Sequence, residues 1–390
     1  MISGVTKAIL TRYVYCVKNP GCKVKTVTLN NVQQTAGQQH IRVLVVDDSS
    51  SQRHMLIGML ESDPMIEVVA WASNGLEAIQ AVKRFKPDLV TMDLRMPVMD
   101  GLLASEHIMR DHPTPILMVT GSISRSNQHM ISQALNAGVL GILAKPNAKS
   151  LTAGEEFVRV VKGLSQVRLR GRHNKTLSNL VHPRETILKT TSSNTFLPLE
   201  HAKVIGIVAS TGGPPVLEEI LSALPKDFEI PILVVQHIAA GFAQSLVDWL
   251  SPLCHIPIRI ASPGSKLESG ITIASGEHLT VRNGKLAGSL EPPVSGHRPS
   301  GTVLFRSLAA EFGSSAVGVV LTGMGNDGAV GLSNLKNAGG TVIAQDKSSS
   351  VIHSMPVAAI NLGIVDAVLN PSQIAATLSN LKLEQPNRPA

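Results

Sequence analysis

The sequence is poor in aromatic residues and in cysteine, and each scarcity restricts what the chain can be. Phe, Trp and Tyr make up 3% of its 390 residues, so its cores must be packed mainly from Val, Ile, Leu, Ala and Met. The three cysteines, Cys16, Cys22 and Cys254, show neither a metal-ligand spacing nor a disulfide framework, which favours a cytoplasmic location. No apolar run approaches the roughly 20 residues needed to span a bilayer, so we expect no direct membrane insertion.

Charged residues are also scarce, at 16% of the chain, and they are unevenly placed. The formal net charge of +7 arises in residues 1–40, which carry five basic residues and no acidic one, and in residues 151–201. The rest of the chain is close to neutral. We therefore expect no nucleic-acid partner, because such a partner needs a basic surface on the folded parts.

Hydrophobic patterning separates the first half of the chain into three segments. Residues 1–40 lack periodicity and are interpreted as a disordered or spurious N-terminal extension. Residues 41–164 hold five apolar strand-like runs that alternate with helical patterns, and residues 165–201 form a basic flexible linker. The alternation predicts an α/β domain with a five-stranded parallel, flavodoxin-like sheet covered by helices on both faces.

A second alternating region covers residues 202–385 and predicts another doubly wound domain. Its sheet is expected to be mainly parallel and Rossmann-like. The Asn283-Gly284 pair between two short apolar runs predicts an antiparallel hairpin inside it. The strand candidates are 204–208, 231–236, 271–274, 278–282, 287–290, 316–321 and 340–344.

Polar side chains follow successive predicted strands of the first domain. Asp47 and Asp48 come after the first strand and Asp93 after the third, and the ends of parallel strands meet at one edge of a sheet. Three carboxylates there can hold Mg²⁺, a hard cation that prefers oxygen ligands. Thr120 and Lys145 end the fourth and fifth strands and can bind phosphoryl oxygens. One acidic residue at a strand end is often a helix cap, but five such positions favour phosphoryl transfer to Asp93.

These positions, with the run Met96-Pro97-Val98-Met99-Asp100-Gly101, resemble the response-regulator receiver domain over residues 41–150. The resemblance implies that Asp93 is the phosphoacceptor and that a chemotaxis histidine kinase is the phosphodonor. Arg95 stands where receivers often have an acidic or amide side chain, and Ile142 where many have an aromatic switch residue. These two departures leave the switching kinetics open but not the phosphoryl acceptance. The implied Mg²⁺ ligands are Asp47, Asp48 and Asp93, and the implied phosphoryl-binding residues are Thr120 and Lys145.

The second domain places a hydroxyl, an imidazole and a carboxylate after three predicted strands. Ser210 lies on a glycine turn that opens a helix, His237 follows the next strand, and Asp327 lies in a glycine-rich segment. A serine hydroxyl needs a base to take its proton, and a carboxylate can fix the tautomer of that base. These residues predict a serine hydrolase, although their order and the absence of a G-x-S-x-G elbow match no generic hydrolase motif.

Simpler explanations exist for each of these residues. Ser210 can cap a helix, His237 can be structural, Asp327 can form a turn, and the glycine-rich segments can hold a nucleotide phosphate. Two other classes stay open: a receiver-coupled DNA-binding regulator, favoured only by the basic linker, and a noncatalytic adaptor with a vestigial triad. Cys254 beside His255 is a further possible nucleophile, but no orienting pattern surrounds it, which favours ordinary packing.

Short runs within residues 203–370 carry a more specific resemblance. They are Ala209-Ser210-Thr211-Gly212-Gly213-Pro214, Val235-Gln236-His237, Gly296-His297-Arg298-Pro299-Ser300, Leu304-Phe305, Leu321-Thr322-Gly323-Met324-Gly325-Asn326-Asp327-Gly328-Ala329, Gln345-Asp346 and Met355-Pro356. In these runs the chain resembles the catalytic domain of the chemotaxis protein-glutamate methylesterase/glutamine deamidase family. Val208 replaces the family's usual Gly and is expected to crowd the floor of the pocket.

The resemblance implies a phosphorylation-regulated hydrolase that acts on chemoreceptor helices in chemotactic adaptation. It would release methanol from glutamate methyl esters and deamidate glutamines, with no cofactor for the esterase reaction. The unphosphorylated receiver is expected to cover the catalytic face. Arg298 either positions the acidic receptor segment or forms a structural salt bridge. The implied catalytic residues are Ser210, His237 and Asp327, with the backbone N–H groups of Thr211 and Met324 as oxyanion donors.

Overall fold

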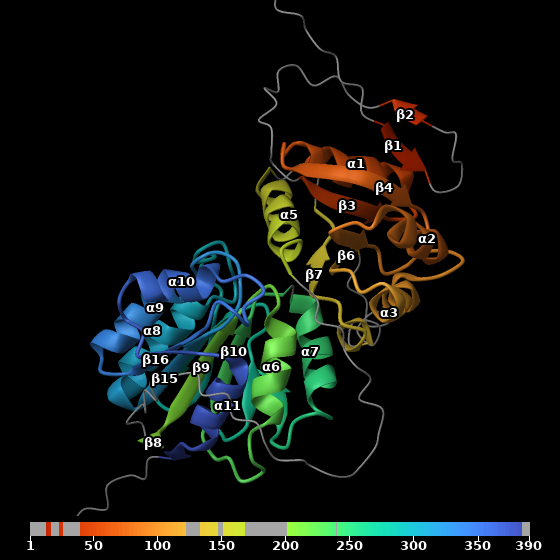
Figure 1. Cartoon of the computed structure of the whole chain (residues 1–390). Helices are drawn as coiled ribbons and strands as arrows, with labels where there is room; N and C mark the ends of the chain where they lie inside the picture. Colours follow the sequence, from red (N-terminus) through yellow and green to blue (C-terminus); the bar gives the residue numbers. More distant parts are fainter. Residues whose placement is uncertain are drawn as a thin grey trace, which may run out of the picture.

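The computed structural model describes residues 13–16, 23–25, 40–121, 133–146, 151–167, 201–238 and 240–383. They form two α/β units, coloured from orange to yellow and from green to blue in Figure 1. The domain boundaries at 41–164, 165–201 and 202–385 stay predictions, because residues 168–200 lie outside the described part of the chain.

The first unit is built on a sheet with the strand order β2-β1-β4-β3-β5-β6-β7. Strands β4, β3, β5, β6 and β7 run parallel, which confirms the predicted five-stranded sheet. The strands are β3 (Ile41–Val46), β4 (Ile66–Ala72), β5 (Leu89–Met92), β6 (Ile116–Thr120) and β7 (Gly141–Ala144).

Two short strands precede this sheet in the chain and extend its edge. β1 (Tyr13–Cys16) lies parallel to β4 and pairs antiparallel with β2 (Lys23–Lys25). Sequence patterning does not predict either strand, because residues 1–40 show no periodicity. For the rest of residues 1–39 the interpretation as a disordered or spurious extension falls outside the described residues.

Helices cover both faces of the first sheet, as a parallel sheet requires. α1 and α5 bury Leu56, Leu60 and Phe157 against one face, and α2 and α3 bury Val82 and Ile108 against the other. The bounds are α1 (Ser50–Glu61), α2 (Gly75–Phe85), α3 (Gly101–Asp111) and α5 (Leu151–Leu164). Residues 133–136, which precede β7, are also helical.

The second unit contains a seven-stranded parallel sheet in the order β11-β12-β10-β9-β15-β16-β17. Five of these strands match sequence candidates, whereas the short outer strands β11 and β17 have no counterpart among them. The strands are β9 (Val204–Ala209), β10 (Ile232–Gln236), β11 (Ile258–Ile260), β12 (Ile271–Ile273), β15 (Ala316–Val320), β16 (Thr341–Gln345) and β17 (Ala367–Leu369).

An antiparallel hairpin joins β13 (His278–Arg282) to β14 (Lys285–Ser289), as the Asn-Gly pair predicts. Asn283 and Gly284 have φ angles of 51° and 66°, the left-handed conformation that a type I′ turn demands at both central positions. A further small sheet pairs β8 (His201–Ala202) with β18 (Lys382–Leu383), near the two ends of the unit.

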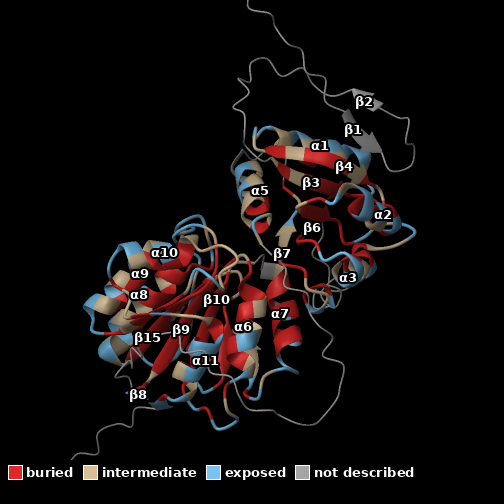
Figure 2. Ribbon diagram, viewed as in Figure 1, coloured by how far each residue is buried: buried red, intermediate tan, exposed pale blue. Residues whose placement is uncertain are grey.

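Helices also cover both faces of the second sheet. Residues of α6, α7 and α11 pack on one face and residues of α8, α9 and α10 on the other, around strands that are almost entirely buried (Figure 2). The helices are α6 (Gly213–Ser222), α7 (Ala243–Leu250), α8 (Gly301–Phe312), α9 (Ala329–Asn337), α10 (Ser354–Asn361) and α11 (Pro371–Ser379), with short 3₁₀ turns η1 (Ala240–Phe242) and η2 (Gly313–Ser315).

The chain order of the second sheet reverses at β9. The chain goes from β9 to β10 on one side and later returns to β15 on the other, so β9 is the topological switch point. Ligands of open α/β sheets bind in the crevice that forms at the carboxyl ends of the strands on either side of such a point. The fold therefore places Ser210, which follows β9, at the position where a substrate site is expected.

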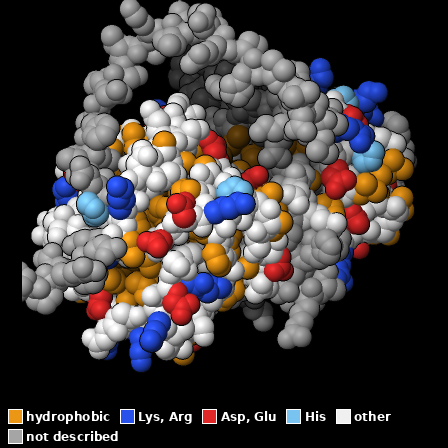
Figure 3. All heavy atoms as spheres, turned by 90° about the horizontal axis from the view of Figure 1, so that it is seen from below, with side chains coloured by type: hydrophobic (Ala, Val, Ile, Leu, Met, Phe, Trp, Pro, Cys, Tyr) orange, Lys and Arg blue, Asp and Glu red, His pale blue; other side chains and the backbone are white. Residues whose placement is uncertain are grey.

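The described surface carries no sign of a large basic face in the view of Figure 3. Lys and Arg side chains are interspersed with Asp and Glu on that face rather than gathered by sign. Among the described residues, no helix combines the length and the apolar character that crossing a membrane requires.

Candidate functional site

Ser210 lies between β9 and α6, and its backbone is fixed from three directions. Its N–H donates to the carbonyl of Thr322 at 3.0 Å, and its carbonyl accepts from Gly213 N at 2.8 Å and from Gln236 Nε2 at 2.8 Å. Gly323 allows this close approach, since a Cβ there would lie 2.6 Å from the Cβ of Ser210. The turn therefore holds Ser210 against the segment that follows β15.

His237 is the first residue after β10, beside β9, and it pairs with Asp327. The His237 Nε2 atom lies 2.8 Å from Asp327 Oδ2, and both side chains are almost completely buried. Because a carboxylate only accepts, Nε2 carries the proton of the neutral ring, and Nδ1 has the free lone pair. Nδ1 is buried and has no hydrogen-bond partner within the described residues.

The N-terminus of α8 holds Asp327 in its charged form. Ser300 Oγ donates to Asp327 Oδ1 at 2.6 Å, and the amides of Gly301 and Thr302 donate to the same carboxylate at 2.6 and 3.1 Å. Burial raises the pKa of Asp327, but the hydrogen bonds from His237, Ser300 and Gly301 outweigh burial and hold it well below its ordinary range. Asp327 is therefore an anion at neutral pH and can stabilise an imidazolium.

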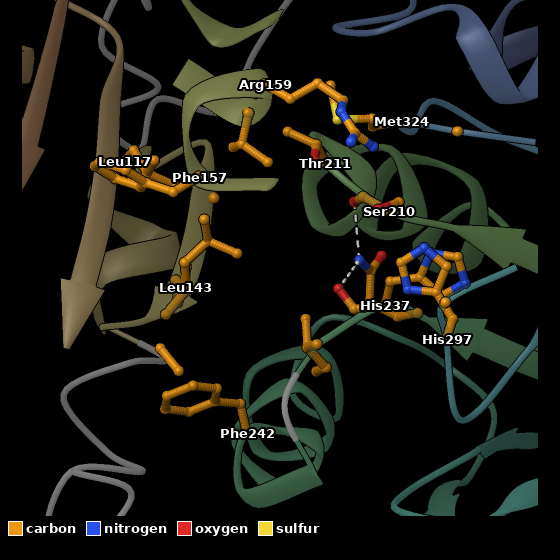
Figure 4. Close-up of a pocket in the computed structure, with 18 of the residues that line it drawn as sticks. Leu117, Leu143, Phe157, Arg159, Ser210, Thr211, His237, Phe242, His297 and Met324 are labelled. Carbon is orange, nitrogen blue, oxygen red and sulfur yellow. Dashed lines mark hydrogen bonds between the residues drawn. The ribbon is translucent and has the colours of Figure 1, made fainter. Parts of the chain in front are cut away.

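Ser210, His237 and the two predicted oxyanion donors line one pocket (Figure 4). Among the described residues, the amides of Thr211 and Met324 have no hydrogen-bond acceptor, so both N–H groups are available to an incoming oxygen. Ser210 and His237 share no hydrogen bond in this structure. Such bonds often form only when substrate is present, and Nδ1 is the ring nitrogen left for the serine proton.

The predicted acidic cluster of the first unit also comes together. Carboxylate oxygens of Asp47, Asp48 and Asp93 lie within 4.8 Å of one another, and Lys145 Nζ contacts Asp47 at 2.6 Å and Asp93 at 2.8 Å. Burial raises the pKa of Asp93 more than Lys145 lowers it. Burial lowers the pKa of Lys145, but its bonds to the two carboxylates outweigh this and raise it. Thr120 is buried at the end of β6 beside Lys145, whose amide donates to the Thr120 carbonyl.

The donor set of this cluster fits Mg²⁺. Asp47 and Asp93 are almost fully buried, and buried carboxylates that crowd together need positive charge nearby. Lys145 supplies one cation to two of the three carboxylates, which leaves an excess of negative charge made of hard oxygen ligands. Asp47, Asp48 and Asp93 would hold the ion.

The pocket that contains Ser210 and His237 is bounded by both units. Its cavity of about 840 Å³ is lined by residues of the second unit and by residues of β6, β7 and α5, including Leu117, Phe157 and Arg159 (Figure 4), and by Lys145, which follows β7. Met324 packs against the core of the first unit, and Trp249 Nε1 donates to Asn136 Oδ1 at 2.7 Å. The first unit therefore lies over the entrance to Ser210.

Comparison with known proteins follows the two units. The response regulator receiver domain family matches residues 43–153, and the CheB methylesterase family matches residues 205–378. The chain is 40% identical over 353 residues to protein-glutamate methylesterase/protein-glutamine glutaminase 4 of Geobacter metallireducens, which covers 88% of this chain and all of that protein. The chain belongs to the CheB methylesterase family.

A second relative gives the same result. Protein-glutamate methylesterase/protein-glutamine glutaminase 3 of Anaeromyxobacter dehalogenans is 41% identical over 347 residues, or 87% of this chain and 98% of that protein. A solved structure, the CheB methylesterase catalytic domain of Thermotoga maritima, is 36% identical to this chain. The match covers 46% of this chain and 97% of the Thermotoga maritima chain, with a TM-score of 0.44.

Several finer expectations for this methylesterase can be compared with the structure. Val208 does not line the pocket; it is fully buried and packs against the backbone of Gly301 and Gly328. Arg298 is exposed at the pocket, and it donates to the carbonyls of Leu290 and Glu291 rather than forming a salt bridge among the described residues.

Cys254 is not suited to act as a nucleophile. Burial and Glu218 raise the pKa of its thiol to about 11, which suppresses the thiolate, and it packs against the hydrophobic core. In the receiver, Ile142 packs between cores of the two units, so the position of the aromatic switch residue is filled by an interface residue.

Sequence reasoning assigned no role to three residues around His237 and Asp327. Ser300 and Gly301 bind Asp327, and His297 stacks on His237 with 3.7 Å between ring centroids and 9° between planes. All three lie in or beside the run Gly296-His297-Arg298-Pro299-Ser300, which carries the family resemblance. That run is a loop without periodicity, so only the motif itself could point to these residues.

Proposed function

We propose that Ser210, His237 and Asp327 form the catalytic triad by which this chain hydrolyses glutamate methyl esters. The observation that carries the proposal is the His237–Asp327 pair. Its Nε2–Oδ2 contact of 2.8 Å leaves Nδ1 buried and without a partner among the described residues, on a side chain that lines the same pocket as Ser210. A base whose tautomer is fixed by a buried anion is what an unactivated serine requires.

The reaction follows from this arrangement. His237 Nδ1 takes the proton of Ser210 as Oγ attacks the side-chain carbonyl, and the Asp327 anion stabilises the imidazolium that forms. The amides of Thr211 and Met324 donate to the oxygen that becomes negative, each contributing about 10²–10³-fold in rate. His237 then returns the proton to the departing methoxide, so methanol leaves. Water attacks the acyl-enzyme by the same route and restores Ser210.

The same atoms can act on a glutamine side chain. The amide carbonyl occupies the position of the ester carbonyl, and His237 protonates departing ammonia instead of methanol. The relatives named above carry both activities in their names, protein-glutamate methylesterase and protein-glutamine glutaminase. Chemoreceptor helices that contain such glutamates and glutamines are the substrates of this proposal, in a cytoplasmic setting. Arg298, exposed at the pocket, offers a positive charge to their acidic residues.

The receiver supports phosphoryl transfer from a histidine kinase to Asp93. The carboxylate of Asp93 attacks the phosphorus of the kinase's phosphohistidine, the P–N bond breaks and the kinase imidazole leaves. Lys145 and the hydroxyl of Thr120 receive the phosphoryl oxygens. Mg²⁺, when bound by Asp47, Asp48 and Asp93, offsets the negative charge of these oxygens. A phosphoryl group on Asp93 competes for Lys145, which now contacts both Asp47 and Asp93.

Regulation by the receiver is supported by the shared pocket. Lys145 and Pro146 line the cavity that leads to Ser210, so the phosphoacceptor site and the active site are joined through a few residues of β7. Movement of Lys145 toward a phosphoryl group alters the wall of that cavity. Phosphorylation would then shift the equilibrium from a covered to an open active site.

The hydrolase proposal is tested by methanol release from methylated chemoreceptor membranes with the full chain. Ser210→Ala is expected to reduce the rate by at least about 10³-fold, because the nucleophile is removed. Cys254→Ser is the matched control and should retain the wild-type rate. Full activity in Ser210→Ala would overturn the triad, and loss of activity only in Cys254→Ser would identify a cysteine hydrolase.

The receiver proposal is tested by stimulation of the same reaction with a small phosphodonor and Mg²⁺. Asp93→Asn should abolish the stimulation while leaving the unstimulated rate in place. Asp111→Asn, an exposed carboxylate at the end of α3, is the control and should be stimulated as the wild type is. Undiminished stimulation of Asp93→Asn would exclude Asp93 as the acceptor.

A further inference from the structure

His237 has three groups around its ring, and the triad accounts for only two of them. One edge faces Asp327, and Nδ1 on the other side of the ring is left for Ser210. A face of the ring is covered by His297, with ring centroids 3.7 Å apart and planes 9° from parallel (Figure 4). We infer that His297 is a positioning residue, whose ring fixes the plane of the His237 imidazole so that Nδ1 stays available to the Ser210 hydroxyl.

The backbone of His297 is held by a tight turn. Val294 and His297 donate to each other's carbonyls at 3.1 and 3.0 Å, and the two residues between them have positive φ angles, 53° for Ser295 and 82° for Gly296. Two successive left-handed residues are typical of the rigid type I′ turn. The ring of His297 therefore projects from a fixed point rather than from a mobile loop.

The segment that carries His297 also carries the residues that bind Asp327. Ser300, Gly301 and Thr302 follow His297 by three to five positions and donate to the Asp327 carboxylate. One segment thus fixes both the acid that binds the edge of His237 and the ring that covers its face. The imidazole is left little freedom to rotate, and small misplacements of a catalytic group are costly in rate.

The stacked geometry excludes a proton relay between the two rings. The lone pairs and N–H bonds of an imidazole lie in its plane, and these planes are nearly parallel, so neither ring can donate to the other. His297 can act on His237 only through packing and charge. A neutral aromatic face attracts the imidazolium that forms during the reaction, whereas a protonated His297 would repel it.

His297 is neutral at the pH where a serine hydrolase works. Burial, and then the charge of His237, lower the pKa of His297 to about 4, and Asp327 opposes this only in part. Arg298, the next residue in the chain, adds a further positive charge at the pocket, and Lys145, Glu155 and Arg159 line the same cavity from the receiver. The ring therefore serves as a neutral surface and not as a second base.

This inference rests on the proposed triad and is tested by two substitutions in the full chain. His297→Ala removes the ring, and His297→Phe keeps a flat aromatic surface that cannot titrate. We expect His297→Ala to lower kcat for methanol release by about ten- to a hundredfold, part of the general-base contribution, with KM nearly unchanged. His297→Phe should restore kcat to within about threefold of the wild type, since the stacking surface is present again.

A second measurement reports directly on His237, the proposed general base. The rate at which a fluorophosphonate labels Ser210 is measured against pH, because this reaction needs His237 but no receptor substrate. In His297→Ala the labelling rate should fall and the apparent pKa of its pH profile should move, whereas His297→Phe should keep the wild-type rate above pH 6. A residue that only stabilises the fold would leave both the rate and the profile unchanged in protein that is still folded.

The outcomes separate this inference from the triad itself. If His297→Ala retains the wild-type kcat and labelling profile, His297 does not position the base. If folded His297→Phe is as impaired as His297→Ala, stacking is not what matters, and the inference fails as well. If Ser210→Ala instead releases methanol normally, the proposed triad itself is wrong. That failure is distinguishable from a failure of the His297 inference, because it does not depend on the His297 variants. Should His297→Ala not fold, His297→Phe alone decides.

Discussion

Val208 is a single side chain that supports the active site from behind. Its methyl groups fill the space beside the backbone of Gly301 and Gly328, where a Cβ on Gly301 would lie 2.5 Å from Val208 Cγ2. Both glycines adjoin groups of the site, since Gly301 N binds Asp327 and Gly328 follows it. The residue that differs from the family's usual Gly therefore packs beside the glycines next to Asp327, the acid of the proposed triad, and not into the pocket that Ser210 lines.

Val208→Gly is expected to lower the free energy of unfolding by about 2–4 kcal/mol, from the lost packing and the added freedom of the unfolded chain. Chemical denaturation measures this change. Val208→Ala should cost roughly half as much, because it keeps Cβ. Since Val208 does not line the pocket, KM should not change in either variant, and a large change in KM would contradict the packing described.

His297 also gives the fold a dependence on pH. Its pKa is about 4 in the folded chain, below the ordinary histidine value near 6.5, so the unfolded chain binds more protons between these values. Stability is therefore fully present above about pH 6.5 and falls as the pH falls toward 4. Between pH 7 and pH 5 the expected loss is on the order of 1–2 kcal/mol.

The His297→Phe variant isolates this component. Denaturation of the wild type and the variant at pH 7 and pH 5 should show a smaller loss in the variant, because Phe does not titrate. The same pH sensitivity in both proteins would mean that His297 is not held neutral in the folded chain.

Among the secondary-structure elements, α8 has the largest share in the chemistry. Its N-cap Ser300 donates to Asp327, and its first amides do the same, so the positive end of the helix faces the buried carboxylate. α8 is also joined to the β13–β14 hairpin, because Ser300 N donates to His278 Nδ1 in β13. The antiparallel hairpin thus supports the helix that supports the acid.

Ser300→Ala removes both the N-cap and one hydrogen bond to Asp327. We expect a stability loss of about 1 kcal/mol and a fall in kcat of about tenfold, since Asp327 loses one of its fixed donors. Ser300→Thr keeps the hydroxyl and should stay close to the wild type in both measurements. Equal kinetics for the Ala and Thr variants would show that the two backbone amides alone hold Asp327.

The same elements show how far the sequence could predict this molecule. Strands β9, β10 and β15 are continuous apolar runs, so their ends, and with them Ser210 and His237, could be located from patterning alone. Strands β11 and β17 are three residues long and only partly buried, and no periodicity marks them. The stacking of His297 depends on a turn and on a partner 60 positions away, which local patterns do not encode.

At the scale of the whole molecule, the two units are joined by contacts that close the catalytic pocket. Gly163 at the end of α5 lies against Ile352, where a Cβ would come within 2.3 Å of its Cδ1. Leu135 of the first unit packs in the core of the second, and Phe242 packs in the core of the first. These contacts between the units are mostly apolar and have little directional preference. A hydrogen bond among them therefore has a large effect on the relative orientation of the two units.

The bond from Trp249 Nε1 to Asn136 Oδ1 is that contact, and it offers a test of the covered state. Trp249→Phe keeps a large aromatic ring but removes a hydrogen bond worth about 1 kcal/mol, which corresponds to roughly a fivefold shift in a two-state equilibrium. If the covered state predominates without phosphorylation, the unstimulated rate of methanol release should rise by up to about fivefold. The rate with phosphodonor, when the site is already open, should stay unchanged.

Asn136→Ala should act in the same way, and Gln244→Ala, an exposed change on α7, should have no effect. Unaltered unstimulated rates in both Trp249→Phe and Asn136→Ala would mean that this contact does not hold the receiver over Ser210.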